Sequence, residues 1–154
     1  MNKLPEGITL QLYLAFPGVD SSSWEVLFSS TKKWLHPLFE LEEFLASHTI
    51  EIINNKCTFE FGNGLKVSSS DLFLRDTVIG RAAAVLITRM GINRLGANLI
   101  SRLAIPLLQE HSVQFEAIKT IDAIDCMTEN LLKDYSDYEE AYAVLAERRV
   151  NALK

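Results

Sequence analysis

The sequence is poor in the residues that build metal sites and disulfide frameworks. It contains two cysteines and three histidines among 154 residues. Cys57 and Cys126 are far apart, and neither belongs to a Cys-x-x-Cys or a Cys/His spacing. A disulfide scaffold or a zinc site is therefore not indicated. We expect reduced thiols, no metal and no cofactor.

Long apolar runs are also missing. The longest run is far shorter than the ~20 residues of a membrane-spanning helix. The N-terminal stretch "MNKLPEGITLQ" lacks the apolar core of a signal peptide. The sequence therefore predicts a cytoplasmic protein that does not associate with membranes.

Basic residues are in the minority. The chain has 15 Lys and Arg against 20 Asp and Glu, a net charge of −5. Binding to a phosphate backbone normally needs a basic surface, so general nucleic-acid binding is not expected. The arginines are nevertheless clustered, since five of the seven fall within residues 75–102, where Asp76 is the only acidic residue. This local basic zone suits a small anionic ligand.

The composition is that of one packed domain. Hydrophobic residues make up 48% of the chain and charged residues 23%, which is ordinary for a folded protein and not for a disordered one. A chain of this length fits one domain. We therefore predict a single domain over residues 1–154.

Hydrophobic patterns predict the secondary structure of the N-terminal half. Residues 8–16, "ITLQLYLAF", alternate as a half-buried strand does, and residues 24–30 resume the alternation, which predicts an antiparallel hairpin. Pro37 opens an amphipathic helix, whose apolar stripe consists of Leu38, Leu41 and Leu45. Residues 50–70 are typical of a hairpin-like insert, and "SSSD" after it indicates a loop.

The C-terminal half predicts strands alternating with helices. The stretch "DTVIGRAAAVLITRMG" predicts a helix from about residue 77, with Asp76 as its N-cap and Gly91 after its end. The stretch "INRLGANLI" predicts a strand, Ser101 would cap the helix "RLAIPLLQEH", and "VQFEA" predicts a further strand. Helical patterns follow over residues 120–133 and over the C-terminal 134–154.

This order of elements predicts the architecture. Strand and helix alternate over residues 77–118, which implies parallel strands joined by crossover helices. With the N-terminal hairpin, the result is a mixed central sheet. We expect helices on both of its faces, as in a three-layer α/β/α sandwich.

The segment 76–117 resembles a known family. Its residues "DTVIGRAAAVL", "LISRLAIPLL" and, further on, "CMTE" are similar to the pattern D-K-x-V-G-K-A-A-A-L-L, I-S-x-x-A-x-x-L and C-P-M-E of an uncharacterised bacterial domain-of-unknown-function family. The upstream "STKKWLHPLFELEEFL" resembles that family's shorter helix. The resemblance implies a cytidine-deaminase-like fold without the zinc motifs. Arg81 replaces the usual lysine, and Thr128 stands within the altered "CMTE".

The helix starts exclude the chemistry of the zinc deaminases. Those enzymes carry H/C-x-E at the start of one helix and P-C-x-x-C at the start of the next. The corresponding stretches here are "IGRAAA" and "SRLAIP", which contain no zinc ligand. Zinc-dependent deamination is therefore not expected.

The same two helix starts form the candidate binding site. In such a fold they follow the carboxyl ends of neighbouring strands, where α/β sheets usually bind ligands. Free N–H groups there, together with Arg81 and Arg102, suit a phosphate or carboxylate. Asp76 would orient Arg81, Gly80 would allow close approach of a ligand, and Ser101 opens the second helix. Alternatively, Asp76 is only a cap and Arg81 a solvated charge.

A second candidate pair lies further along the chain. Cys126 and Glu129 are three residues apart, so on a helix they would be neighbours and could act as nucleophile and acid/base group. No histidine accompanies them, however, and a thiol usually needs a basic or cationic neighbour for activation. A buried structural cysteine is the competing interpretation.

Three functions remain open from the sequence. The favoured one is a non-catalytic module that binds an anionic or nucleotide-like small molecule. The second is a metal-independent enzyme that uses Cys126 and Glu129, or Asp76. The third is an oligomeric scaffold in which residues 50–70 mediate self-association, and a homo-oligomer is expected from the general frequency of two-fold assemblies. Trp24 and Trp34 would pack in the core or in a subunit contact.

Overall fold

The computed structural model describes residues 4–54 and 56–122. Cys126, Glu129 and most of the helix predicted over residues 120–133 lie outside these ranges, as does the predicted C-terminal helix 134–154. Residues 120 and 121 belong to a strand, so a helix does not start at residue 120.

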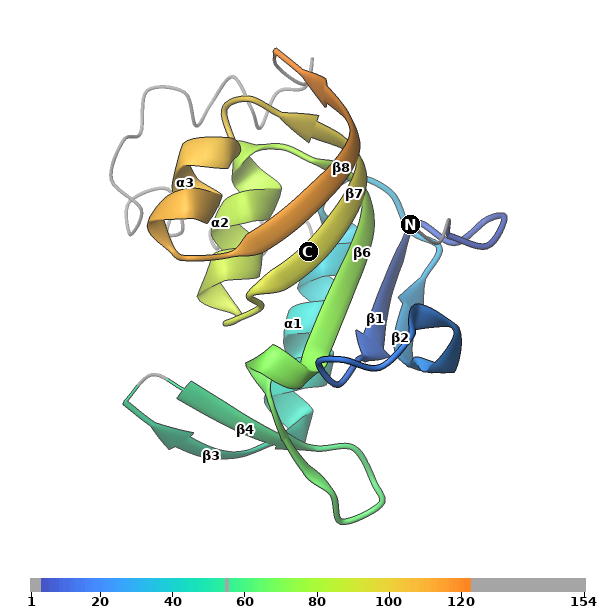
Figure 1. The fold of residues 1–154 in the computed structure, drawn as a ribbon, viewed down its shortest axis with the longest axis vertical. Coiled ribbons are helices and arrows are strands. Elements are labelled where there is room, and N and C mark those ends of the chain that lie inside the picture. Colours follow the sequence, from blue (N-terminus) through green and yellow to red (C-terminus); the bar gives the residue numbers. More distant parts are fainter. Residues whose placement is uncertain (1–3, 55, 123–154) are drawn as a thin grey trace, which may run out of the picture.

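Within the described ranges, the fold consists of two sheets and three α-helices (Figure 1). The main sheet has the strand order β2-β1-β6-β7-β8 and consists of β1 (Leu10–Leu14), β2 (Glu25–Ser30), β6 (Leu72–Ile79), β7 (Arg94–Ser101) and β8 (Gln114–Ile121). The small sheet consists of β3 (Thr49–Ile53), β4 (Lys56–Glu60) and β5 (Lys66–Ser68). The α-helices are α1 (His36–His48), α2 (Arg81–Arg89) and α3 (Ile105–Glu110), and the short 3-10 turns are Ser21–Ser23 and Ser69–Asp71.

The main sheet is mixed, as predicted. β1 pairs antiparallel with both β2 and β6, whereas β6, β7 and β8 are parallel to one another. The N-terminal hairpin is confirmed, with one irregularity in its register between Leu12 and Tyr13. Leu10 and Leu12 are fully buried, because their alternating positions both face the core.

The predicted amphipathic helix is confirmed as α1. Pro37 lies in its first turn, where a missing N–H group costs nothing. Leu38, Leu41 and Leu45 are all buried. Periodicity of apolar residues was therefore sufficient to predict this helix.

The insert predicted over residues 50–70 is confirmed as the small sheet. β3 and β4 extend away from the main sheet (Figure 1). Aromatic packing holds the base of this insert to α1, since the rings of Phe44 and Phe61 are stacked with centroids 5.7 Å apart. Phe59 is 1% exposed and belongs to the core. The insert therefore shares the core of the domain at its base.

The prediction of a helix from residue 77 is wrong. Residues 72–79 form β6, which lies between β1 and β7 in the main sheet. Its burial alternates at Leu72 and Leu74 as in an ordinary strand, but Arg75 and Asp76 interrupt the apolar pattern. α2 starts only at Arg81. Gly91 has φ 83° directly after the helix, as predicted for its C-terminal end.

The predicted role of Ser101 as a helix N-cap is also wrong. Ser101 is the last residue of β7, and its Oγ accepts a hydrogen bond from the Leu103 N–H at 3.1 Å. α3 starts later, at Ile105 after the N-cap Ala104. The reason is Pro106, which fits the first turn of a helix that starts at residue 105 and not the second turn of one that starts at residue 102.

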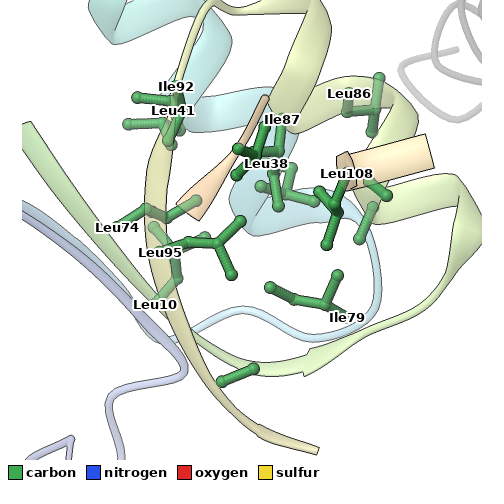
Figure 2. Close-up of a cluster of buried hydrophobic side chains, with 14 of the residues drawn as sticks. Leu10, Leu38, Leu41, Leu74, Ile79, Leu86, Ile87, Ile92, Leu95 and Leu108 are labelled. Atoms are coloured by element: carbon green, nitrogen blue, oxygen red, sulfur yellow. The ribbon is translucent and has the colours of Figure 1, made fainter. Parts of the chain in front are cut away.

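One hydrophobic core joins the main sheet to the helices. Figure 2 shows leucines and isoleucines from β1, β6, β7 and all three α-helices in contact with one another. Within the described ranges, all three α-helices lie on this one face of the main sheet (Figure 1). The expected helices on both faces are therefore not present in this part of the chain, and the three-layer arrangement stays a prediction. In residues 4–54 and 56–122, no helix is long and apolar enough to cross a membrane.

Truncation of a core leucine tests this packing. Leu74 is fully buried in the centre of the main sheet, so Leu74→Ala should lower the free energy of unfolding by about 2–5 kcal/mol. Leu65→Ala is the matched control, because Leu65 is 43% exposed and its truncation should cost less than about 1 kcal/mol. Urea denaturation of both variants checks the prediction, and equal losses would contradict it.

Candidate ligand-binding site

Two parallel strands of the main sheet end side by side. Ile79 of β6 and Ile100 of β7 are register partners, so the segments that follow them leave from the same end of the sheet. We call this place the carboxyl end. Gly80 and Arg81 follow β6 there, and Ser101 ends β7 and is followed by Arg102. The predicted convergence of these four residues at one end of the sheet agrees with this topology.

α2 begins at the carboxyl end without a side-chain cap. Its N-cap is Gly80, in an extended conformation, and no side chain accepts a hydrogen bond as a cap. The prediction that Asp76 caps this helix is therefore wrong, because β6 still continues for three residues beyond Asp76. Ala82, Ala83 and Ala84 are buried and let the first turn lie close to the sheet. The start of α2 has the positive end of the helix dipole.

Asp76 lies inside β6 and is only 8% exposed. Its register partners are Leu10 on β1 and Ala97 on β7, so apolar residues flank it on both sides. Its carboxylate accepts a hydrogen bond from the Thr77 N–H at 2.7 Å. Burial raises the pKa of Asp76 to about 7, although hydrogen bonds from the Thr77 and Val78 N–H groups act in the opposite direction.

A threonine fastens this part of β6 to the N-terminal segment. The Thr77 N–H and hydroxyl groups both donate to the Thr9 carbonyl, at 3.2 and 2.8 Å. Asp76 and Arg81, both described, have no hydrogen bond or ion pair with each other in this structure. The predicted orienting of Arg81 by Asp76 is therefore not supported. Asp76 is instead a buried acid that titrates near neutral pH.

Arg102 is on the surface and already has an acidic partner. Its Nε donates to Asp122 Oδ1 at 2.8 Å, and the two side chains are 66% and 94% exposed. An ion pair this exposed contributes little to stability, so a ligand can compete with it. The Arg102 backbone N–H donates to the Ile121 carbonyl at 2.8 Å. The backbone at this position is thereby held against β8.

Arg75 is buried in the structure, although the sequence alone predicted no specific role for it. Arg75 follows Leu74 in β6, so its side chain points away from α1, α2 and α3. It is 1% exposed, and its Nη2 donates to Asn98 Oδ1 at 3.2 Å. Burial lowers its pKa from the ordinary value, while Tyr13 and Glu116 act in the opposite direction. Recognising 72–79 as a strand would have placed Arg75 on this far face of the main sheet.

These features define a small mixed α/β protein with polar groups at the carboxyl end of its parallel strands. The family described as a domain of unknown function, DUF1893 (TM1506), matches residues 63–148. This match covers more than half of the chain, which therefore belongs to that family.

A solved structure shares the fold. It is the crystal structure of a DUF1893 family protein, TM1506, from Thermotoga maritima, with 21% sequence identity and a TM-score of 0.63. The similarity covers 91% of this chain and 80% of the other chain. Among curated proteins, nothing matches this chain. The resemblance to a domain-of-unknown-function family is thus confirmed, and the deaminase-like fold stays a prediction.

The buried Asp76 predicts a pH-dependent stability. Its pKa rises from 3.8 to about 7 on folding, so the folded state binds the proton more tightly. The stabilisation is complete below pH 4 and is lost as the pH rises to about 7, with a maximum of about 4 kcal/mol. Asp76→Asn keeps an acceptor for the Thr77 N–H and removes the ionisation. It should be more stable than the wild type at pH 8 and less pH-dependent.

Urea denaturation of both proteins between pH 4 and pH 8 measures this effect. The wild-type midpoint should fall over this range relative to that of Asp76→Asn. Parallel curves for the two proteins would mean that Asp76 has an ordinary pKa in the folded protein.

Proposed function

We propose that the protein is a non-catalytic module that binds an anionic, nucleotide-like small molecule at the carboxyl end of β6 and β7. The observation that carries this proposal is the start of α2, where the N-cap is a glycine and no side chain occupies the capping position. A phosphate or carboxylate can accept hydrogen bonds from such a helix start and is favoured by its dipole.

The neighbouring residues supply the charge and the space that such a ligand needs. Arg81 is the first residue of α2, and a guanidinium there can bind a phosphate or carboxylate in bidentate geometry. Arg102 exchanges its exposed contact with Asp122 for the ligand. Gly80 has no side chain to obstruct the approach. Cys126 and Glu129, also predicted near this site, lie outside the described ranges.

The finer description of the fold belongs to the same proposal. We propose a three-layer sandwich of the deaminase-like type without zinc. Residues 123–154, where the sequence predicts further helices, lie outside the described ranges. The family match, which extends to residue 148, supports including these residues in the domain.

A thermal-shift screen of nucleotides, phosphosugars and acidic metabolites tests the binding. A ligand at about 100 times its Kd should stabilise the protein by about 2.7 kcal/mol. Arg81→Ala should abolish the ligand's effect and leave the ligand-free protein folded. Arg89→Ala is the control, because Arg89 lies in the last turn of the same helix and should not affect binding. A screen without hits, or equal effects of the two variants, would contradict the proposal.

A second candidate, a self-associating scaffold, has its own supporting observation. β3 is an edge strand of the small sheet, and its Ile50, Ile52 and Ile53 are 48%, 66% and 57% exposed. Edge strands with exposed apolar side chains tend to pair with other strands. The side chain of Trp34, 80% exposed, is not in the core, whereas Trp24 packs against Phe73 at 4.8 Å.

Sedimentation velocity at several concentrations tests this candidate. The wild type should form a dimer, and Ile52→Lys should shift it toward the monomer by placing a charge in the contact. Ile118→Lys is the matched control, since Ile118 is 59% exposed on β8, the edge strand of the main sheet. A wild type that stays monomeric at every concentration would exclude the scaffold.

A further inference from the structure

Arg75 is fully buried, and the proposed binding site does not use it. It occupies the middle of β6, between Gln11 of β1 and Gly96 of β7. Its side chain is on the far face of the main sheet, the face opposite α1, α2 and α3, and is 1% exposed. An arginine keeps its proton in proteins, so this buried side chain carries a positive charge.

Most of the hydrogen-bonding capacity of this guanidinium is unused. Nη2 donates to Asn98 Oδ1 at 3.2 Å. Nε and Nη1 are buried, and among residues 4–54 and 56–122 neither atom has a hydrogen-bond partner. Burying charged donors without partners is costly, and native proteins seldom leave them so. These two nitrogen atoms therefore indicate a binding partner that accepts hydrogen bonds and carries negative charge.

The polar neighbours Tyr13 and Glu116 favour the charged form of Arg75 electrostatically, but neither accepts a hydrogen bond from Nε or Nη1. Tyr13 donates its hydroxyl hydrogen to Gln11 Oε1 at 2.5 Å, and Gln11 Nε2 donates to Ser29 Oγ at 3.0 Å. These groups are thus occupied with one another. Glu116 is exposed on β8, on the far side of Gly96, and forms no ion pair with Arg75. Gly96, which lies between Arg75 and Glu116 in the register, contributes no side chain to this face.

Three aromatic side chains lie near Arg75 along β1 and β6. Tyr13 and Phe73 are register partners two residues from the Gln11–Arg75 pair, and Trp24 lies 5.8 Å from Tyr13 and 4.8 Å from Phe73, between ring centroids. The three rings form an apolar wall beside the charge. Such a wall lowers the local dielectric constant and strengthens the attraction between Arg75 and an anion.

We propose that Arg75 anchors a second binding site, for a small oxyanion of the phosphate or carboxylate class, on the far face of the main sheet. The oxyanion accepts hydrogen bonds from Nε and Nη1 and neutralises the buried charge. Because both nitrogen atoms are closed to solvent, binding requires a local movement of the side chains that cover them. The site is on the opposite face from the core and does not involve Arg81 or the start of α2, so it is independent of the function proposed above.

Two probes, inorganic phosphate and benzoate, test the site in the full chain. Benzoate adds a ring that can lie against the aromatic wall. In a buffer free of other oxyanions, at least one probe should raise the melting temperature in a saturable way. Arg75→Met should weaken its binding by about tenfold or more, because charge-assisted hydrogen bonds are lost. Lys119→Met, which removes one exposed charge from β8, is the matched control and should bind as the wild type does.

A spectroscopic measurement keeps the test independent of whether Arg75→Met folds. The Nε–H resonance of Arg75 in the wild type should shift during titration with the probe that binds. Arg81→Ala should show the same shift, which separates this site from the one at the carboxyl end. The proposal is overturned if neither probe moves this resonance, or if Arg75→Met binds as tightly as the control. A loss of stability in Arg75→Met without any probe effect also overturns it, because Arg75 would then be paired within the chain.

Discussion

The pairing of β6 with a neighbour on each side is the constraint on which the rest of the structure depends. β1 runs antiparallel to it and β7 parallel to it, so β6 joins the N-terminal hairpin to the crossover unit. Leu72 and Leu74 face the helices and are fully buried. Any loss of this pairing would separate the two halves of the core and would also remove the segment that delivers Gly80 to the start of α2.

β6 buries two adjacent charged residues on opposite faces of the sheet, and the two differ in whether they can become neutral. Asp76 accepts hydrogen bonds from the backbone N–H groups of Thr77 and Val78 and can take up a proton, since burial raises its pKa to about 7. It therefore needs no cation. Arg75 cannot be neutralised in this way, because a guanidinium does not lose its proton at any ordinary pH. The buried acid can become neutral, whereas the buried base stays charged, and this difference is the reason why we propose Arg75 as the anchor of a site.

The elements that were predicted correctly are those in which burial follows an apolar pattern. The hairpin, α1 and the small sheet each show such a pattern in Leu, Ile or Phe. β6 was missed because Arg75 and Asp76 interrupt the alternation, and an aspartate before "GRAAA" resembles a helix start. The carboxyl end could be predicted despite this error, since the order of strands and helices after residue 80 was correct. The position of Arg75 on the far face could not be predicted, because that prediction requires knowing that Arg75 lies inside a strand.

The family relationship does not identify a ligand, so any inference about a ligand depends on the side chains of this chain. A relative at 21% identity shares the fold, but a fold supports many functions, and the site decides among them. At the carboxyl end, an arginine occupies the position where the family resemblance has a lysine. A guanidinium binds planar or tetrahedral oxyanions through several fixed donors, whereas an ammonium acts as a point charge. Under the function proposed above, Arg81 favours a ligand that presents an oxyanion at the start of α2, which is the same ligand chemistry that we propose for Arg75 on the other face of the sheet.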